Sequence, residues 1–222
     1  MRALPTLLAL LTLLSPALAQ KPKVLLAPVE VLDSKAFPFW VKLQTQTEIG
    51  FEAEKFVATS LHTGGAEMVK ALQTDKLMAA LKPALKGKPT DAMDALAAVA
   101  KDGGVDYVLV LQITRWQQKD RSPSEVLANT LGAHSETKTE FRAWLYDAKN
   151  AVLAIDGGGK AVEGVFGGQR IGTQKRDELS GDPAAIAGAM EAVNRRRGLY
   201  IAKAMWTAIR PKLAMATGLE LK

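Results

Sequence analysis

The chain has 222 residues, a formal net charge of +6 and no cysteine, and 48% of its residues are hydrophobic. Without cysteine, disulfides and thiolate metal sites are excluded, so packing alone must stabilise a domain of this length. The basic residues are scattered, which favours a role in solubility; attraction to anionic lipid, glycan or an acidic partner is the alternative, and no nucleic acid partner is expected.

The N-terminal segment has the parts of a secretory signal peptide. Arg2 supplies a positive charge, Leu7–Leu14 form a short apolar stretch, and Ala17–Ala19 are small residues before a cleavage point. The stretch is shorter than the about 20 apolar residues of a membrane span. We therefore expect residues 1–19 to be a cleaved signal peptide, with a retained membrane anchor as the alternative.

The remaining residues, 20–222, are expected to form a single exported domain without a transmembrane helix. Gln20 follows the expected cleavage point, and the chain contains no thiol that could carry a lipid. We therefore expect a protein of the periplasm or the cell exterior that is not a lipoprotein.

Lys23–Val31 is rich in valine and leucine and predicts a first strand. Residues 32–50 show no clear periodicity but contain three aromatic side chains. A long loop with aromatics either covers the core or presents them to a partner. Phe37, Phe39 and Trp40 are therefore the first candidate interaction surface.

The spacing of apolar residues predicts a helix over Phe51–Gly65, with Phe51 in its apolar stripe. Ala66–Leu72 follows as a short strand. Two further helices are expected, with Thr74 and Thr90 as their N-caps.

The stretch Gly103–Ile113 reads GGVDYVLVLQI and follows the second of these helices. A dinucleotide-binding turn needs its glycines after a strand and before a helix, and the order here is the reverse. The glycines are therefore a helix stop. The run behind them is apolar on both faces, which indicates a central strand covered on both sides.

Ser135–Asp147 alternates between polar and apolar residues, as in an antiparallel strand with one exposed face. The residues of the polar face are Glu136, Lys138, Glu140 and Arg142. Ala151–Asp156 returns as the hairpin partner. The glycines from Gly157 to Gly172 then predict a twisted or frayed strand end and a mobile loop that continues to Gly181.

Asp182 and Pro183 predict the start of a long final helix. Gly198 is a weak point within it, and Pro211 should end or kink it. Successive helical residues point about 100° apart, so three consecutive arginines span a broad arc. Either they form a solvated face, or they contact anionic headgroups or an acidic partner, which makes Arg195, Arg196 and Arg197 the second candidate interaction surface.

No catalytic, cofactor or metal site is expected. His62 and His134 are the two histidines, and neither lies in a metal-binding or catalytic pattern. The acidic pair Asp91 and Asp94 is explained by its place in the first turn of a helix. We therefore expect no enzyme, with an unrecognised periplasmic hydrolase as an alternative.

The element order β-α-β-α-α-β-β-β-α predicts an α/β (α+β) fold: one mixed sheet with helices packed on it.

Two segments resemble a known family. Gly104–Ile113 is similar to its glycine-small-Asp-Tyr-Val strand entry, and Tyr146–Leu153 to its Asp-Ala hairpin, although Asn150 stands at the usual glycine. This is the CsgG-like and TolB amino-terminal-domain-like family of bacterial envelope proteins, which includes LpoB-type activators. The resemblance spans Lys23–Leu213 and lacks the lipobox cysteine of the lipoprotein members.

The resemblance implies a non-enzymatic protein-binding or assembly module. Its partners would be envelope proteins or further copies of the chain. An oligomeric secretion or pore component is the alternative that the resemblance implies.

Overall fold

The computed structural model describes six segments of the chain: residues 21–32, 39–70, 77–82, 89–120, 135–165 and 183–222. The signal-peptide prediction, the proposed cap Thr74 and the candidate residue Phe37 lie outside them. Among the described residues, none of the helices combines the length and hydrophobicity that a membrane span needs.

The described strands form one six-stranded mixed sheet in the order β3-β1-β4-β5-β6, with β2 also paired to β4. β1 pairs in parallel with β3 and with β4, and β2 pairs in parallel with β4. β5 pairs antiparallel with both β4 and β6. Their bounds are Lys23–Leu26 (β1), Glu30–Val31 (β2), Glu67–Val69 (β3), Tyr107–Asp120 (β4), Ser135–Asp147 (β5) and Val152–Val165 (β6).

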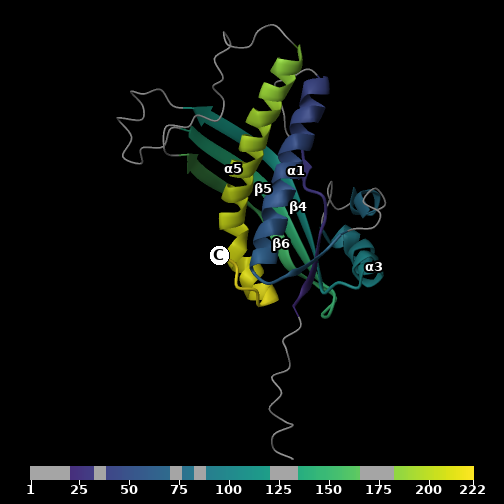
Figure 1. Ribbon diagram of the computed structural model, residues 1–222. Helices are drawn as coiled ribbons and strands as arrows, with labels where there is room; N and C mark the ends of the chain where they lie inside the picture. The colour runs from purple at the N-terminus through teal and green to yellow at the C-terminus, as the bar shows by residue number, and fades with distance from the viewer. Residues whose placement is uncertain (1–20, 33–38, 71–76, 83–88, 121–134, 166–182) are drawn as a thin grey trace, which may run out of the picture.

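Helices cover both faces of this sheet (Figure 1). The long helices α1 (Phe39–Thr63) and α5 (Pro183–Thr217) lie on one face, and α3 (Met93–Gly103) lies on the other. Residues 77–82 are also helical and add Leu77 and Leu81 to the core on the α3 side. The expected element order and the single mixed sheet with packed helices are therefore confirmed.

The strand that follows Gly103–Gly104 is buried on both sides, as predicted. Leu109, Leu111 and Ile113 pack in the core beneath α1 and α5, while Val108 and Val110 pack in the core on the α3 side. All five side chains are at most 2% exposed. β4 lies between β1 and β5, so its backbone is paired on both edges as well.

The hairpin of β5 and β6 is longer than the sequence indicated. The alternation in β5 is confirmed, with buried and more exposed residues in turn up to Arg142. The expectation of a frayed strand end after Asp156 is wrong, because β6 continues through the glycines to Val165. Gly158 fits there because a Cβ at this position would lie only 2.6 Å from the carbonyl oxygen of Phe141.

The helices also differ from their predicted bounds. α1 begins at Phe39, so residues 39–50, for which the sequence showed no clear periodicity, are helical. Thr90 is not an N-cap: Pro89–Ala92 form a 3₁₀ turn, and Ala92 precedes α3 without a side-chain cap. Gly104 ends α3 with a φ of 57°, a left-handed conformation that favours glycine.

α5 starts at Pro183, as predicted, but neither Gly198 nor Pro211 interrupts it. On either side of Pro211, the side chains of Ile209 and Leu213 are at most 3% exposed. We infer that this packing offsets the hydrogen bond that a proline removes from a helix.

Candidate protein-interaction surface

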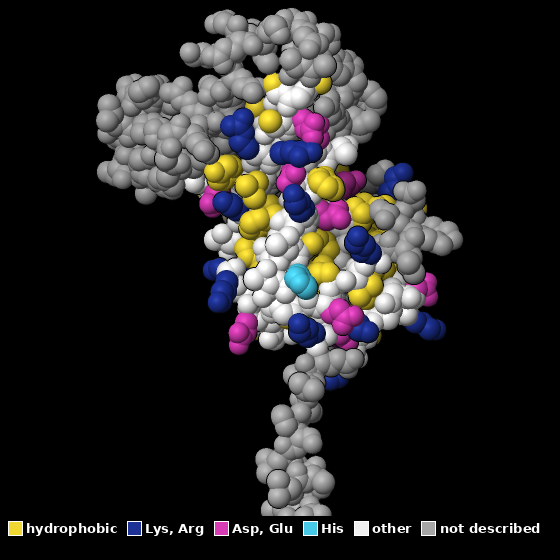
Figure 2. All heavy atoms as spheres, viewed as in Figure 1, with side chains coloured by type: hydrophobic (Ala, Val, Ile, Leu, Met, Phe, Trp, Pro, Cys, Tyr) yellow, Lys and Arg dark blue, Asp and Glu magenta, His cyan; other side chains and the backbone are white. Residues whose placement is uncertain are grey.

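The long helices α1 and α5 run side by side and form the outer layer on their face of the sheet (Figure 1). Figure 2 shows this face with basic, acidic and hydrophobic side chains interspersed. Of the sequence-based candidates, Phe39 and Trp40 belong to α1 and the three arginines belong to α5, whereas Phe37 lies outside the described residues. The contacts of the helices therefore decide which side chains remain available to a partner.

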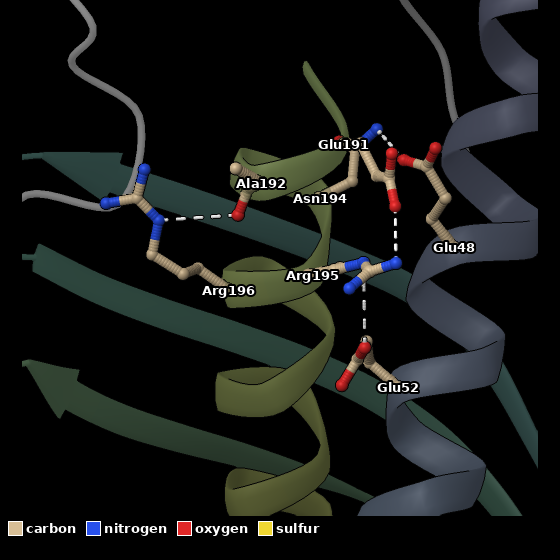
Figure 3. A network of polar contacts seen from close by, with 7 residues as sticks. All are labelled: Glu48, Glu52, Glu191, Ala192, Asn194, Arg195 and Arg196. Carbon is tan, nitrogen blue, oxygen red and sulfur yellow. Dashed lines mark hydrogen bonds and ion pairs between the residues drawn. The ribbon is translucent and has the colours of Figure 1, made fainter. Parts of the chain in front are cut away.

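A buried asparagine joins the two helices (Figure 3). Asn194 is 2% exposed, and its Nδ2 donates to Glu48 Oε2 at 2.7 Å and to Thr45 Oγ1 at 3.3 Å. Its Oδ1 accepts from Arg197 at 3.2 Å. A buried amide is stabilising only when its donors and acceptor are satisfied, and these contacts satisfy them.

The three arginines point to different partners. Arg195 pairs with Glu191 of its own helix and lies 3.9 Å from Glu52 of α1 (Figure 3). Arg196 Nε donates to the carbonyl oxygen of Ala192 at 3.3 Å. The Arg195 side chain is 56% exposed, so its charge stays accessible to solvent.

Arg197 turns toward the sheet instead. Its guanidinium lies 5.6 Å from the centre of the Trp116 ring, and its Nε donates to Gln118 Oε1 at 2.9 Å. Both partners belong to β4, so Arg197 ties α5 to the sheet. The run of three arginines is thus divided between the helix pair and the sheet, and its role in binding stays a proposal.

Phe51 is an exposed aromatic residue, although its spacing placed it in the apolar stripe of the predicted helix. Its side chain is 60% exposed, whereas Ile49, Ala53 and Val57 of the same helix are fully buried. Gly50 lies so close to β2 that a Cβ there would be 2.6 Å from the carbonyl oxygen of Val29. Small residues thus face the sheet at the closest approach, and the bulky ring of Phe51 is left outside.

Phe51 follows the other aromatic candidates of α1 by about three helical turns. Phe39 and Trp40 are the first two residues of the helix. Eleven residues separate positions 40 and 51, and at about 100° per residue they turn through close to three full turns. Positions 40 and 51 therefore lie on the same side of α1. Leu32, directly after β2, is a further exposed apolar residue, at 46%.

The described residues offer little for catalysis. His62 is exposed in the last turn of α1, and His134 lies outside the described residues. Within the described ranges, no group of three His, Cys, Asp or Glu side chains could hold a metal ion.

An open hollow of about 470 Å³ lies on the other face of the sheet, over the middle of β5 and β6. Glu140, Arg142, Asp156 and Lys160 contribute charged groups to its lining, and Trp144 contributes an aromatic one. Lys160 Nζ lies 3.0 Å from Glu140 Oε1, which neutralises two of the four charges. The ionisable groups of the lining are thus two carboxylates, a guanidinium and an ammonium, and it includes neither histidine nor cysteine.

Glu54 of α1 provides a pH-dependent test of the packing between α1 and the segment before β2. Burial raises the pKa of this carboxyl above its ordinary value, and a hydrogen bond from the backbone N–H of Val29 opposes part of the rise. The folded protein therefore binds this proton more tightly than the unfolded chain. The resulting stabilisation is present below the unfolded pKa and is lost as the pH rises through the folded pKa.

Glu54→Gln keeps a hydrogen-bond acceptor for Val29 but cannot ionise. We expect its free energy of unfolding, relative to the original chain, to increase as the pH rises from about 4 to about 7. Urea denaturation at a series of pH values measures this difference. A difference that is constant over the range would show that Glu54 titrates as in the unfolded chain.

Comparison with known proteins gives similarity of fold but no family. No family model matches the chain, and no curated protein matches it significantly. The hypothetical protein CT253 from Chlamydia trachomatis is 11% identical, with 82% of this chain and 98% of that chain covered and a TM-score of 0.40. Lipoprotein GNA1162 from Neisseria meningitidis is 16% identical, with 76% and 97% covered and a TM-score of 0.35.

The C-terminal domain of LpoB from Escherichia coli is a third similar structure, 15% identical, with 64% of this chain and 82% of that chain covered and a TM-score of 0.34. The proteins compared thus include a lipoprotein and an LpoB domain, while membership of the CsgG-like and TolB-like family stays a prediction.

One expectation is contradicted. The sequence led us to expect an exported protein that is not a lipoprotein, because the chain has no cysteine. A lipoprotein is among the solved structures that this chain resembles, and the exclusion is withdrawn.

Proposed function

We propose that the protein is a non-enzymatic binding or assembly module of the cell envelope, which binds a partner protein through the outward side of α1. The α1 surface, as we name it, consists of Leu32 and Phe51 together with the sequence-based candidates Phe37, Phe39 and Trp40. The observation that carries the proposal is the 60% exposure of Phe51 on a long, otherwise well-packed helix.

Aromatic side chains are well suited to such a role. A phenylalanine that is buried by a partner removes a large apolar area from water, and aromatic residues are enriched among those that dominate binding energy. A single exposed apolar residue needs no special explanation, but a cluster of them does. We include Trp40 with Phe51 because the two positions lie on the same side of α1, about three turns apart.

The polar surroundings fit the rim of an interface. Arg195 reaches α1 at Glu52, the residue next to Phe51, and keeps a 56% exposed side chain. A basic group beside an aromatic centre favours a partner with acidic residues at its own rim. We therefore include Arg195 and Arg196 in the proposal as rim residues and not as its centre.

We expect Phe51→Glu to reduce recovery of the partner protein in a pulldown from envelope extract at least tenfold, since a hot-spot residue contributes about 2 kcal/mol or more. Because Phe51 is exposed, the folded structure should tolerate the change.

The matched control is Met215→Glu on α5, since Met215 is 85% exposed. It introduces the same charge at another exposed apolar site and should leave recovery unchanged. Equal recovery of the same protein with both variants and the original chain would remove α1 from the proposal.

A further inference from the structure

We propose that the free edge of β6 pairs with β6 of a second copy of this chain, antiparallel and about a two-fold axis at Gly158. This inference goes beyond the proposed function, because the edge of β6 and the α1 surface lie on different elements. It rests on an edge that pairs with no other described strand, on Gly157, where a Cβ would meet no atom within 4 Å, and on a self-complementary charge pattern.

β6 is an edge strand of unusual length. It has 14 residues and, among the described strands, pairs only with β5 (Figure 1). An edge strand presents a row of backbone donors and acceptors that can pair with another chain. Side chains along it are open to solvent, with Val152 47% and Val162 59% exposed.

The glycines at the middle of β6 are suited to close approach of a second backbone. Among the described residues, the glycines with a positive φ are Gly65, Gly104 and Gly218, so the conformation of β6 does not require glycine. A side chain at Gly157 would meet no atom within 4 Å. Glycine in a strand interior weakens the strand and often marks a place where another backbone or a ligand approaches.

Symmetry limits the register of such a pair. Two identical edges can join antiparallel only about an axis perpendicular to the sheet, which places side chains of one face opposite side chains of the same face. Asp156, Gly158 and Lys160 share one face, because they pair with Trp144, Arg142 and Glu140 of β5. An axis at Gly158 therefore sets Asp156 of each copy opposite Lys160 of the other.

This register uses the regular part of the strand. The irregularity in the pairing of β5 and β6 falls between Ile155 and Leu153, so residues 155–161 of each copy can form an uninterrupted ladder. Its centre coincides with the middle of β6. Both charged groups are accessible: Asp156 is exposed, and the Lys160 side chain is 81% exposed. Opposite charges that face each other across strands stabilise a pair, and like charges destabilise it.

Charge reversal tests both the partner and the register. We expect the original chain to dimerise reversibly in sedimentation velocity, with a dissociation constant that rises with salt. Asp156→Lys and Lys160→Asp should each raise that constant about tenfold, because each variant sets like charges opposite each other at two symmetric positions. Both positions are exposed, and circular dichroism and thermal unfolding check that the variants remain folded.

The decisive sample is an equimolar mixture of Asp156→Lys and Lys160→Asp. In the mixed pair both contacts again join a basic and an acidic side chain, so we expect heterodimers with the affinity of the original chain. The double variant Asp156→Lys/Lys160→Asp should likewise dimerise. An original chain that stays monomeric up to about 0.5 mM, well above the micromolar constants of weak complexes, would overturn the proposal. The proposal would also be overturned if the single variants dimerised as tightly as the original chain, or if the mixture stayed monomeric.

Discussion

Leu111→Ala should lower the free energy of unfolding by about 2–5 kcal/mol, the usual range for a leucine truncated in a core. Leu111 is fully buried in β4, in the core that α1 and α5 cover. Its strand has helices on both faces, so the surrounding side chains have little freedom to fill the cavity. Equilibrium denaturation with urea or guanidinium measures the change.

Val162→Ala is the matched control for this prediction. Val162 lies on the edge strand β6 and is 59% exposed, so its truncation should change the free energy of unfolding by less than about 0.5 kcal/mol. Similar losses for Leu111→Ala and Val162→Ala would mean that β4 is not the buried centre of the sheet.

Gly198→Ala should destabilise the protein by about 1–3 kcal/mol, the cost of overpacking a tight contact. α5 crosses α1 at this residue: a Cβ here would lie 2.9 Å from Cβ of Glu52 and 3.0 Å from the carbonyl oxygen of Ile49. Helix propensity alone favours alanine over glycine by about 1 kcal/mol. If Gly198→Ala lowers the free energy of unfolding, the loss therefore has to come from the contact between α5 and α1.

Gly188→Ala, in the same helix, should change the free energy of unfolding in the opposite direction and serves as the control. Gly188 is exposed, and a Cβ there would meet no atom within 4 Å. We expect this variant to gain about 0.5–1 kcal/mol, because alanine restricts the unfolded chain and favours the helix. If Gly198→Ala also raised the midpoint of thermal unfolding, the helices would not approach as closely as described.

Strong periodicity made much of the sheet predictable. The apolar run of β4 and the alternation of β5 each follow from which faces the layers cover, and both are present where expected. The failures lie where packing overrides local preference. β6 passes through three consecutive glycines, each of which is paired with a residue of β5, and α5 passes through Pro211 between the buried side chains of Ile209 and Leu213.

The first half of α1 was missed for a related reason. Its apolar residues have no regular helical spacing, and its buried positions include Thr45, which is 1% exposed and accepts a hydrogen bond from Asn194 of α5. A polar core position supported by a residue far along the chain leaves no periodic hydrophobic signal.

The candidate surface was predictable only in part. Phe39 and Trp40 were identified from composition, but Phe51 was placed in the apolar stripe of a helix because of its spacing from the next apolar residues. Its exposure follows from the small residues Gly50 and Ala53 at the approach of α1 to the sheet, which sequence periodicity does not weigh. The run of arginines could not be divided among its partners without the positions of Glu52 and Trp116.

The outward side of α1 as the binding surface is tested most directly by site-specific photocrosslinking in intact cells. A photoreactive phenylalanine analogue at position 51 should give one dominant adduct with another envelope protein, and Trp40→Ala should weaken that adduct. The same analogue at position 215, which is also exposed, should give none. Adducts of equal yield from positions 51 and 215, or no adduct from position 51, would contradict the account.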